Sequence, residues 1–108
     1  MDTLLDLDDI RMFTLAAQSG SLSGAAQELR VATSTVSRSL TRLERRLGLL
    51  LVRRGQHGLR LTDAGKGYFS SCGRALRTLR DAEDLLERHQ SHPGRVTKVA
   101  VQEQWRDM

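Results

Sequence analysis

Guanidinium and hydroxyl groups are concentrated in one short stretch of the chain, residues 30–60. This segment holds eight arginines and a single acid, Glu44, so it carries a charge of +7 against +4 for the whole chain. The remaining residues therefore sum to −3. Threonines and serines lie between the arginines, at positions 33, 34, 35, 37, 39 and 41. Guanidinium groups bind phosphates and guanine edges, and hydroxyls can bond to bases or phosphates. The pattern is typical of a surface that reads a duplex polyanion.

The middle of this segment is predicted to be a helix with two unlike faces. Val36, Leu40, Leu43 and Leu47 recur at spacings of 4, 3 and 4, which predicts a helix from about Thr33 to Leu47 that ends at Gly48. At about 100° per residue, the opposite face holds Ser34, Arg38, Thr41, Arg42 and Arg45. Such a helix has the size and the chemistry to enter the major groove of DNA.

Two shorter helices are predicted before it. Leu7, Ile10, Phe13 and Ala17 lie at helical spacing, and Gly20 ends that helix. A second helix is expected over 23–29, capped by Ser21 or Ser23. Residues 30–32 form the turn between the second and third helices, giving a helix-turn-helix. Because the turn has no glycine, we expect backbone strain at Arg30.

A β-hairpin and a long helix are predicted after it. Two short runs flank Gly55 and Gly58, which favours a hairpin that forms a wing. From 62–63 a long helix is expected to run to about residue 92, ahead of Pro93-Gly94. A heptad seam on this helix is formed by Tyr68, Cys72, Ala75, Leu79, Ala82 and Leu86. We infer that this seam pairs with a second copy of the chain; the alternative is that it packs on the winged domain of the same chain.

The positions of these elements nominate a set of DNA-contacting residues. The start of a reading helix usually points at the bases. We therefore expect Thr33, Ser34, Ser37 and Arg38 nearest the bases, Thr41, Arg42 and Arg45 further along the helix near phosphates, and Arg54, His57 and Arg60 from the wing. Other roles stay open for some of them. Arg42 and Arg46 could pair locally around Glu44 or with the acidic first helix, Ser37 could bond the preceding turn, and His57 could be a solvent-exposed turn residue.

Composition argues against several other classes of protein. The aromatic residues are Phe13, Tyr68, Phe69 and Trp105, and none lies in the basic segment, which disfavours single-strand binding by base stacking. One cysteine and three scattered histidines give no metal-ligand spacing, so neither metal nor cofactor is expected. The sequence contains no recognisable set of a nucleophile and a base and no phosphate-binding loop, so an enzyme is not expected. No apolar run reaches 18 residues, and the acidic start is unlike a signal peptide, so no membrane association is expected and the cytoplasm is the expected location.

The residues in several of these places also match one known family. The matching motifs are S-L-S-G-A-A-Q-E-L at 21–29, V-S-R-S-L at 36–40, L-E-R-R-L-G at 43–48, L-V-R-R at 51–54 and L-T-D-A-G at 61–65. Over roughly residues 5–92 the chain resembles the amino-terminal domain of LysR-type transcriptional regulators of bacteria.

The resemblance implies a mainly α fold, a winged helix-turn-helix of three helices and a β-hairpin wing, followed by a long dimerising linker helix. The expected parts are residues 1–62 for DNA binding, 63–92 for the linker helix, and 93–108 as a tail that resembles the first strand (about Val96–Val101) of an effector-binding domain. A small-molecule effector is implied only if the rest of that domain is present. The function implied is sequence-specific binding of promoter DNA as a homodimer. The alternative is a protein-interaction module that forms mixed dimers with a full-length relative.

Overall fold

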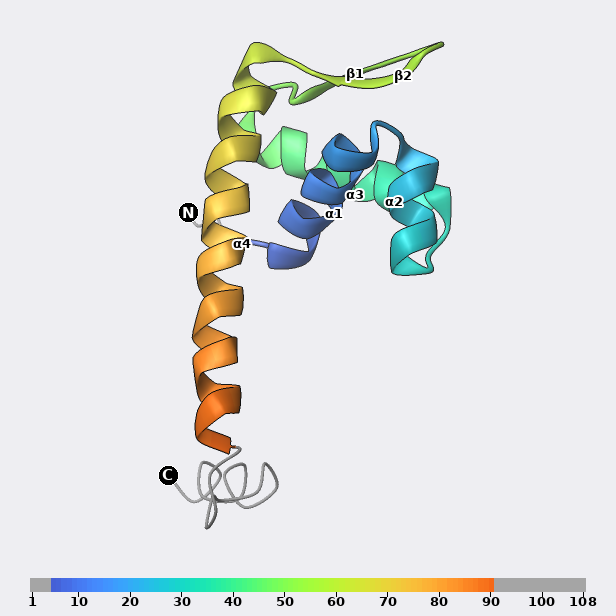
Figure 1. Ribbon diagram of the computed structural model, residues 1–108. Coiled ribbons are helices and arrows are strands. Elements are labelled where there is room, and N and C mark those ends of the chain that lie inside the picture. Colours follow the sequence, from blue (N-terminus) through green and yellow to red (C-terminus); the bar gives the residue numbers. More distant parts are fainter. Residues whose placement is uncertain (1–4, 91–108) are drawn as a thin grey trace. The chain divides into compact units, whose positions relative to one another are not determined.

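The computed structural model describes residues 5–90. In chain order the elements are α1 (Leu7–Ser19), α2 (Leu22–Leu29), α3 (Thr33–Leu47), β1 (Val52–Gly55), β2 (Gly58–Leu61) and α4 (Asp63–Gln90) (Figure 1). The predicted mainly α fold, three helices, a hairpin and a long helix, is confirmed. The expected strand at 96–101 and the helix end at Pro93-Gly94 lie outside the described residues. Over residues 5–90, no helix combines the length and the apolar character needed to cross a membrane.

Side-chain caps and left-handed residues set the ends of the first two helices. The carboxylate of Asp6 accepts a hydrogen bond from the Asp9 amide at 3.1 Å, and Gly20 ends α1 with φ 73°. The Ser21 hydroxyl accepts from the Gly24 amide at 2.9 Å, so α2 begins at Leu22. The predicted start at Ser23 was therefore wrong by one residue, because Ser21 is the residue that satisfies the free amides of the first turn.

The turn between α2 and α3 is made without glycine, as the sequence indicates. Arg30 adopts φ 60° and ψ 47°, and it is the non-glycine residue with positive φ in the described part of the chain. Its amide donates to the Gln27 carbonyl at 3.3 Å, and the Val31 amide donates to the Ala26 carbonyl at 3.0 Å. A left-handed conformation costs an L-residue roughly 1–2 kcal/mol, so the turn stores strain at Arg30.

One apolar core joins the first three helices to the start of α4. Phe13, Val36, Leu40 and Leu43 are completely buried. The Phe13 ring centroid lies 5.7 Å from that of Tyr68 and 6.3 Å from that of Phe69 on α4. By contacts between residues, the chain divides into two compact units, one up to Ala75 and one from Leu76, and the expected functional boundary at residue 62 stays a prediction. We call the first of these the winged unit.

The hairpin is the wing of this unit and is fixed at its base. β1 and β2 are antiparallel, with Val52 opposite Leu61 and Gly55 opposite Gly58, and the chain reverses over Gln56 and His57. The Leu59 amide donates to the Gly20 carbonyl at 3.0 Å, which ties β2 to the corner between α1 and α2. A side chain at Gly58 would place Cβ 2.7 Å from the Gly20 oxygen, so this close approach requires glycine.

Glu44 connects the end of α3 to the start of the wing. Its carboxylate accepts hydrogen bonds from the amides of Leu51 (2.7 Å) and Val52 (3.2 Å). Its main-chain carbonyl accepts from the amides of Gly48 (2.8 Å) and Leu49 (3.2 Å) at the helix end. The one acid of the arginine-rich segment is therefore a structural residue that fixes where the wing begins.

Candidate nucleic-acid interface

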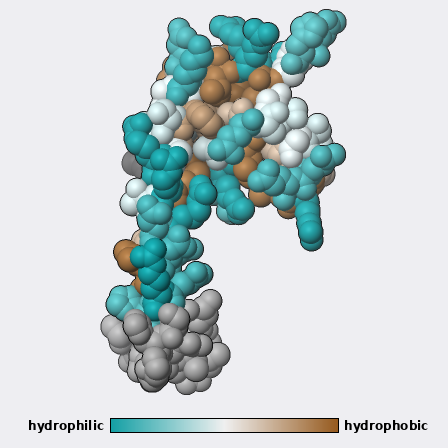
Figure 2. All heavy atoms as spheres, in the orientation of Figure 1, coloured by the Kyte–Doolittle hydropathy of each residue, from teal (hydrophilic) through white to brown (hydrophobic). Residues whose placement is uncertain are grey.

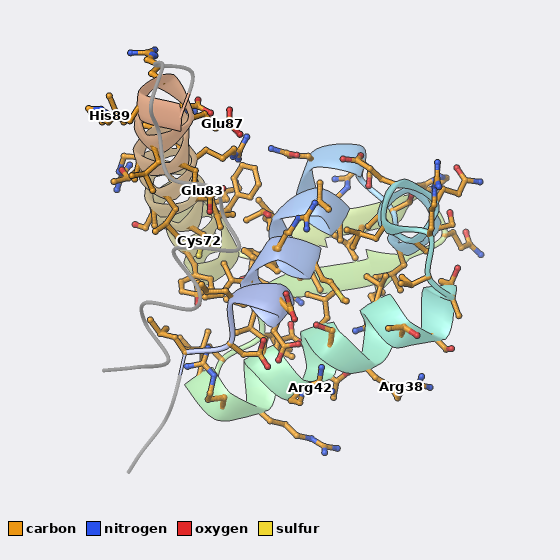
Figure 3. The ribbon with its side chains drawn as sticks, turned by 90° about the horizontal axis from the view of Figure 1, so that it is seen from below. Arg38, Arg42, Cys72, Glu83, Glu87 and His89 are labelled. Atoms are coloured by element: carbon orange, nitrogen blue, oxygen red, sulfur yellow. The ribbon has the colours of Figure 1, made fainter. Side chains whose placement is uncertain are left out.

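The two faces of α3 are divided as the apolar spacing predicts. Val36, Leu40 and Leu43 point inward and are completely buried. The predicted contact residues Thr33, Ser34, Arg38, Arg42 and Arg45 are exposed, and Ser37 and Thr41 are half-buried. Arg38 projects from α3 away from the other helices (Figure 3). Hydroxyl and guanidinium groups thus line the outer face along the whole length of the helix.

The first turn of α3 adds main-chain donors that the sequence pattern did not reveal. Its N-cap is Ala32, which has no side chain that can cap the helix. The Thr35 amide turns back to the Ala32 carbonyl at 3.0 Å, whereas within residues 5–90 the amides of Thr33 and Ser34 have no hydrogen-bond acceptor. Free amides at a helix start carry partial positive charge and suit a phosphate oxygen. The lack of Ser, Thr, Asp or Asn at position 32 was the sequence signal for this feature.

Arg42 differs from the other exposed arginines because it holds a buried carboxylate. Its Nε lies 3.0 Å from Asp9 Oδ2, and its NH2 lies 2.7 Å from Asp9 Oδ1. The Asp9 side chain is 4% exposed and that of Arg42 is 62% exposed. The Ser39 hydroxyl also donates to Asp9, at 2.5 Å. The pairing with the acidic first helix, left open by the sequence, is therefore present, and a phosphate contact from Arg42 stays a prediction.

The charge on Asp9 is stabilised although the residue is buried. Burial by itself raises the pKa of this carboxyl, but the hydrogen bonds from Arg42 and Ser39, together with the positive charges of Arg42 and Arg46, outweigh it and hold the pKa below its ordinary value. The same hydrogen bond to Asp9 raises the pKa of Arg42. The pair fixes α1 against α3 through a charge-assisted bidentate contact.

The wing lies beside the outer face of α3 and contacts it directly. Arg54 NH1 donates a hydrogen bond to Ser37 Oγ at 2.9 Å. Ser37 therefore bonds to the wing rather than to the preceding turn. At the hairpin, a hollow of about 160 Å³ is lined by residues 53–58 and Arg60. Within it, Arg53, Arg54, His57 and Arg60 are exposed, which gives the wing a cationic surface. Arg53 was not among the predicted contacts, although the run of arginines included it.

The predicted seam of α4 divides between the two units. Cys72 is 6% exposed and Tyr68 is half-buried, because both pack inside the winged unit, as Figure 3 illustrates for Cys72 near the base of α4. Burial raises the pKa of both side chains. Ala75, Leu79, Ala82 and Leu86 are exposed, with Leu79 at 47% and Leu86 at 62%. Tyr68 and Cys72 therefore pack on the winged unit of their own chain, which was the alternative that the sequence left open. Pairing with a second copy through the other four residues stays a prediction.

The visible face of the winged unit is largely hydrophilic, and the described residues hold no metal-binding cluster. In Figure 2, hydrophilic residues project on all visible sides of it, with hydrophobic residues gathered between them. Across the described residues 5–90, no three His, Cys, Asp or Glu side chains are grouped to hold a metal ion. The arrangement supplies hydrogen-bond donors and positive charge on the outer face of α3 and on the wing.

Comparison with known proteins finds relatives of one kind. A family model described as "Bacterial regulatory helix-turn-helix protein, lysR family" matches residues 7–66. An HTH-type transcriptional regulator of Xanthomonas campestris pv. campestris is 39% identical over 88 residues, which is 82% of this chain and 26% of that protein. The regulator CrgA of Neisseria meningitidis serogroup C is 38% identical over 88 residues, covering 81% of this chain and 29% of CrgA. The chain thus spans about a quarter of the length of these curated relatives, which are transcription regulators rather than enzymes.

Solved structures of DNA-binding domains share the fold. The BenM DNA-binding domain, in its complex with catB site 1 DNA, matches 82% of this chain and 98% of its own, with a TM-score of 0.76 and 25% identity. The CbnR DNA-binding domain, in complex with DNA, matches 80% of this chain and 99% of its own, with a TM-score of 0.72 and 26% identity. Both comparison domains are bound to DNA in those crystals.

Proposed function

This chain belongs to the lysR family of bacterial regulatory helix-turn-helix proteins, and on that premise we propose that it binds double-stranded DNA sequence-specifically in transcription control. Cytoplasmic promoter DNA is the proposed partner. Bases would be read by Thr33, Ser34, Ser37 and Arg38, with Thr41, Arg42, Arg45 and the wing residues Arg54, His57 and Arg60 near the backbone.

The observation that carries this proposal is the outer face of α3. Its donors are exposed or half-buried along the helix, while Val36, Leu40 and Leu43 on the opposite face are completely buried in the core, so the helix is held rigidly with its polar side outward. The wing adds further cations beside the same face, through the Arg54–Ser37 contact. Phosphate contacts orient a protein on DNA, and groove contacts from such a helix carry specificity.

The experiment measures binding of the purified chain to a pool of random-sequence duplexes as salt is raised. If each subunit neutralises about six phosphates, the logarithm of the binding constant should fall with the logarithm of salt concentration with a slope of roughly −5. Selection from the pool should also enrich one motif. Failure to bind any duplex at low salt, or binding with no enrichment, would overturn the proposal.

We also propose that the chain acts as a homodimer through α4. Ala75, Leu79, Ala82 and Leu86 lie along one face at heptad spacing and are exposed. The charges along the helix are segregated: residues 64–80 carry four cations and no acid, and residues 81–87 carry four acids and no cation. Two such helices placed antiparallel set cations against acids, whereas a parallel pair sets like charges together.

A pair of neighbouring leucines supplies a matched test of this interface. Leu86→Glu puts a carboxylate on the exposed stripe, and Leu85→Glu puts the same group about 100° around the helix. Both leucines are exposed, at 62% and 54%, so the substitutions disturb the isolated chain equally little. Sedimentation equilibrium should show a weaker dimer for Leu86→Glu only. Equal effects, or a monomeric parent protein, would contradict the proposed interface.

The exposed stripe on α4 also supports the second candidate, a module that forms mixed dimers with a longer relative. The discriminating result is co-purification with such a relative by a chain that binds no DNA by itself. DNA binding by the isolated chain favours the first proposal.

A further inference from the structure

One hydrogen bond joins the wing to α3, from Arg54 to Ser37. Arg54 lies on β1, opposite Leu59, and its NH1 is 2.9 Å from the Ser37 hydroxyl oxygen on the second turn of α3. Arg54 is exposed and Ser37 is half-buried, so the pair lies at the surface proposed to face DNA. The neighbouring Arg53 makes no side-chain hydrogen bond to any residue that the structure describes.

This bond changes what the hydroxyl can offer to a ligand. A serine hydroxyl has one donor hydrogen and two acceptor lone pairs, and a guanidinium group can only donate. With Arg54 donating to it, one lone pair of Ser37 Oγ is used and the hydroxyl hydrogen remains available. Thr41 bonds to the Ser37 main-chain carbonyl at 3.1 Å and leaves the hydroxyl untouched. A cationic donor also polarises the O–H bond, which makes the hydroxyl a better donor and a poorer acceptor.

We propose that Arg54 is a positioning residue that sets the base selectivity of Ser37. Held by Arg54, the hydroxyl acts as a donor and selects base edges that present an acceptor in the major groove, namely guanine O6 or N7, adenine N7 or thymine O4. It discriminates against cytosine, which presents only an amino group there and therefore needs an acceptor, whereas adenine stays acceptable through N7. The inference rests on the proposed DNA binding and adds to it a specific rule for one base position.

The alternative role for Arg54 is a simple phosphate contact, and the two roles give different results. Loss of a phosphate contact weakens binding to all sequences about equally. Loss of the positioning bond frees the lone pair that Arg54 occupied and makes the hydroxyl a better acceptor, so that cytosine becomes acceptable at the one position that Ser37 reads. The two side chains then act as one unit, and their substitutions do not add.

The test uses the full chain and a random-sequence duplex pool, with Ser37→Ala, Arg54→Met, the double variant, and Arg53→Met as the matched wing control. For each protein, the selected motif is determined, and affinities are measured for the best duplex and for its single-base variants. A thermal melt of each protein checks the fold, and Arg54→Gln serves as a second variant if Arg54→Met melts early.

Arg54→Met should reduce discrimination at the same base position as Ser37→Ala, by roughly threefold to tenfold, as expected for one hydrogen bond. In the Ser37→Ala background it should change discrimination there no further. Arg53→Met should lower affinity for all duplexes and leave the motif unchanged. A uniform loss of affinity with Arg54→Met, additive with Ser37→Ala, would overturn the inference while leaving the proposed function intact. A parent protein that selects no motif would overturn the proposed function itself.

Discussion

Arg42 and Asp9 form a bidentate pair that joins the middle of α3 to the first turn of α1. Both carboxylate oxygens of the buried Asp9 are engaged, at 3.0 and 2.7 Å, and Ser39 bonds to the same carboxylate. An arginine on the proposed DNA face therefore has a structural task, because it compensates the charge of a carboxylate that the fold removes from water.

Asp9→Asn should destabilise the winged unit, because the neutral amide cannot accept equally strong bonds from Arg42 and Ser39. We expect a loss of about 1–3 kcal/mol in the free energy of unfolding, measured by urea denaturation. Asp8→Asn is the matched control, since Asp8 lies in the same turn and is exposed. The pairing has no importance for stability if the two variants unfold at the same urea concentration.

The stability contributed by Asp9 should depend on pH in a defined direction. The pKa of this carboxyl is lowered in the folded protein, so its contribution is present above the unfolded-state pKa of about 4 and is lost as the pH falls through the lower folded value. The difference in unfolding free energy between the parent and Asp9→Asn should therefore be constant at neutral pH and shrink below about pH 4. Denaturation curves collected across this range measure it, and a gap that widens with acidification would contradict the assignment.

Gly65→Ala should disrupt the junction between the wing and α4. A Cβ at this position would collide with the main-chain carbonyl oxygen of Leu51, which is held in place because it accepts a hydrogen bond from the Thr62 amide. We expect destabilisation of about 3 kcal/mol or more.

Gly67→Ala provides the control for that substitution. It lies in the same helix two residues later, and nothing lies within 4 Å of its added Cβ. Because alanine is the better helix former, Gly67→Ala should stabilise the protein by up to about 1 kcal/mol. Thermal melts that shifted in the same direction for both variants would show that the clash is relieved by movement of the chain.

Arg30→Gly should stabilise the protein, because it removes a left-handed arginine from the helix-turn-helix turn. The expected gain is about 1 kcal/mol, seen as an increase of several degrees in Tm. Arg30→Ala removes the same side chain but keeps the unfavourable backbone conformation, so it should give no gain. If alanine stabilised as much as glycine, charge repulsion among the arginines would explain the effect better than strain.

Arg38→Ala should weaken specific DNA binding by about 1–3 kcal/mol and leave thermal stability unchanged. Arg38 is exposed, and the structure shows no side-chain hydrogen bond for it within residues 5–90, so its loss costs the fold nothing. Fluorescence anisotropy with the selected duplex measures the first effect, and a melt measures the second. An unchanged affinity would show that Arg38 makes no important contact with DNA.

Much of this architecture could be predicted because it depends on local patterns. The aliphatic spacing on α3 indicated its bounds and its buried face, and the paired glycines indicated the hairpin. The contacts made by Asp9 with Arg42 and by Glu44 with Leu51 could not be read in the same way, because no periodicity links charged residues on separate elements. The seam on α4 was ambiguous for a related reason. Heptad spacing marks an apolar face but does not specify its partner, and the Phe13 ring proved to cover Tyr68.

Glu44 is both the one acid of the arginine-rich segment and the residue that anchors the wing, which limits how this protein can be redesigned. An engineer seeking tighter DNA binding would be drawn to delete the last negative charge from the arginine-rich segment, a change that looks purely favourable on a charge map. Yet the carboxylate holds the first two amides of the wing segment, and without it the hairpin would lose its anchor on the helix end. The affinity gained from the added positive charge would be offset, because a wing that is not held in place loses conformational entropy when it binds DNA.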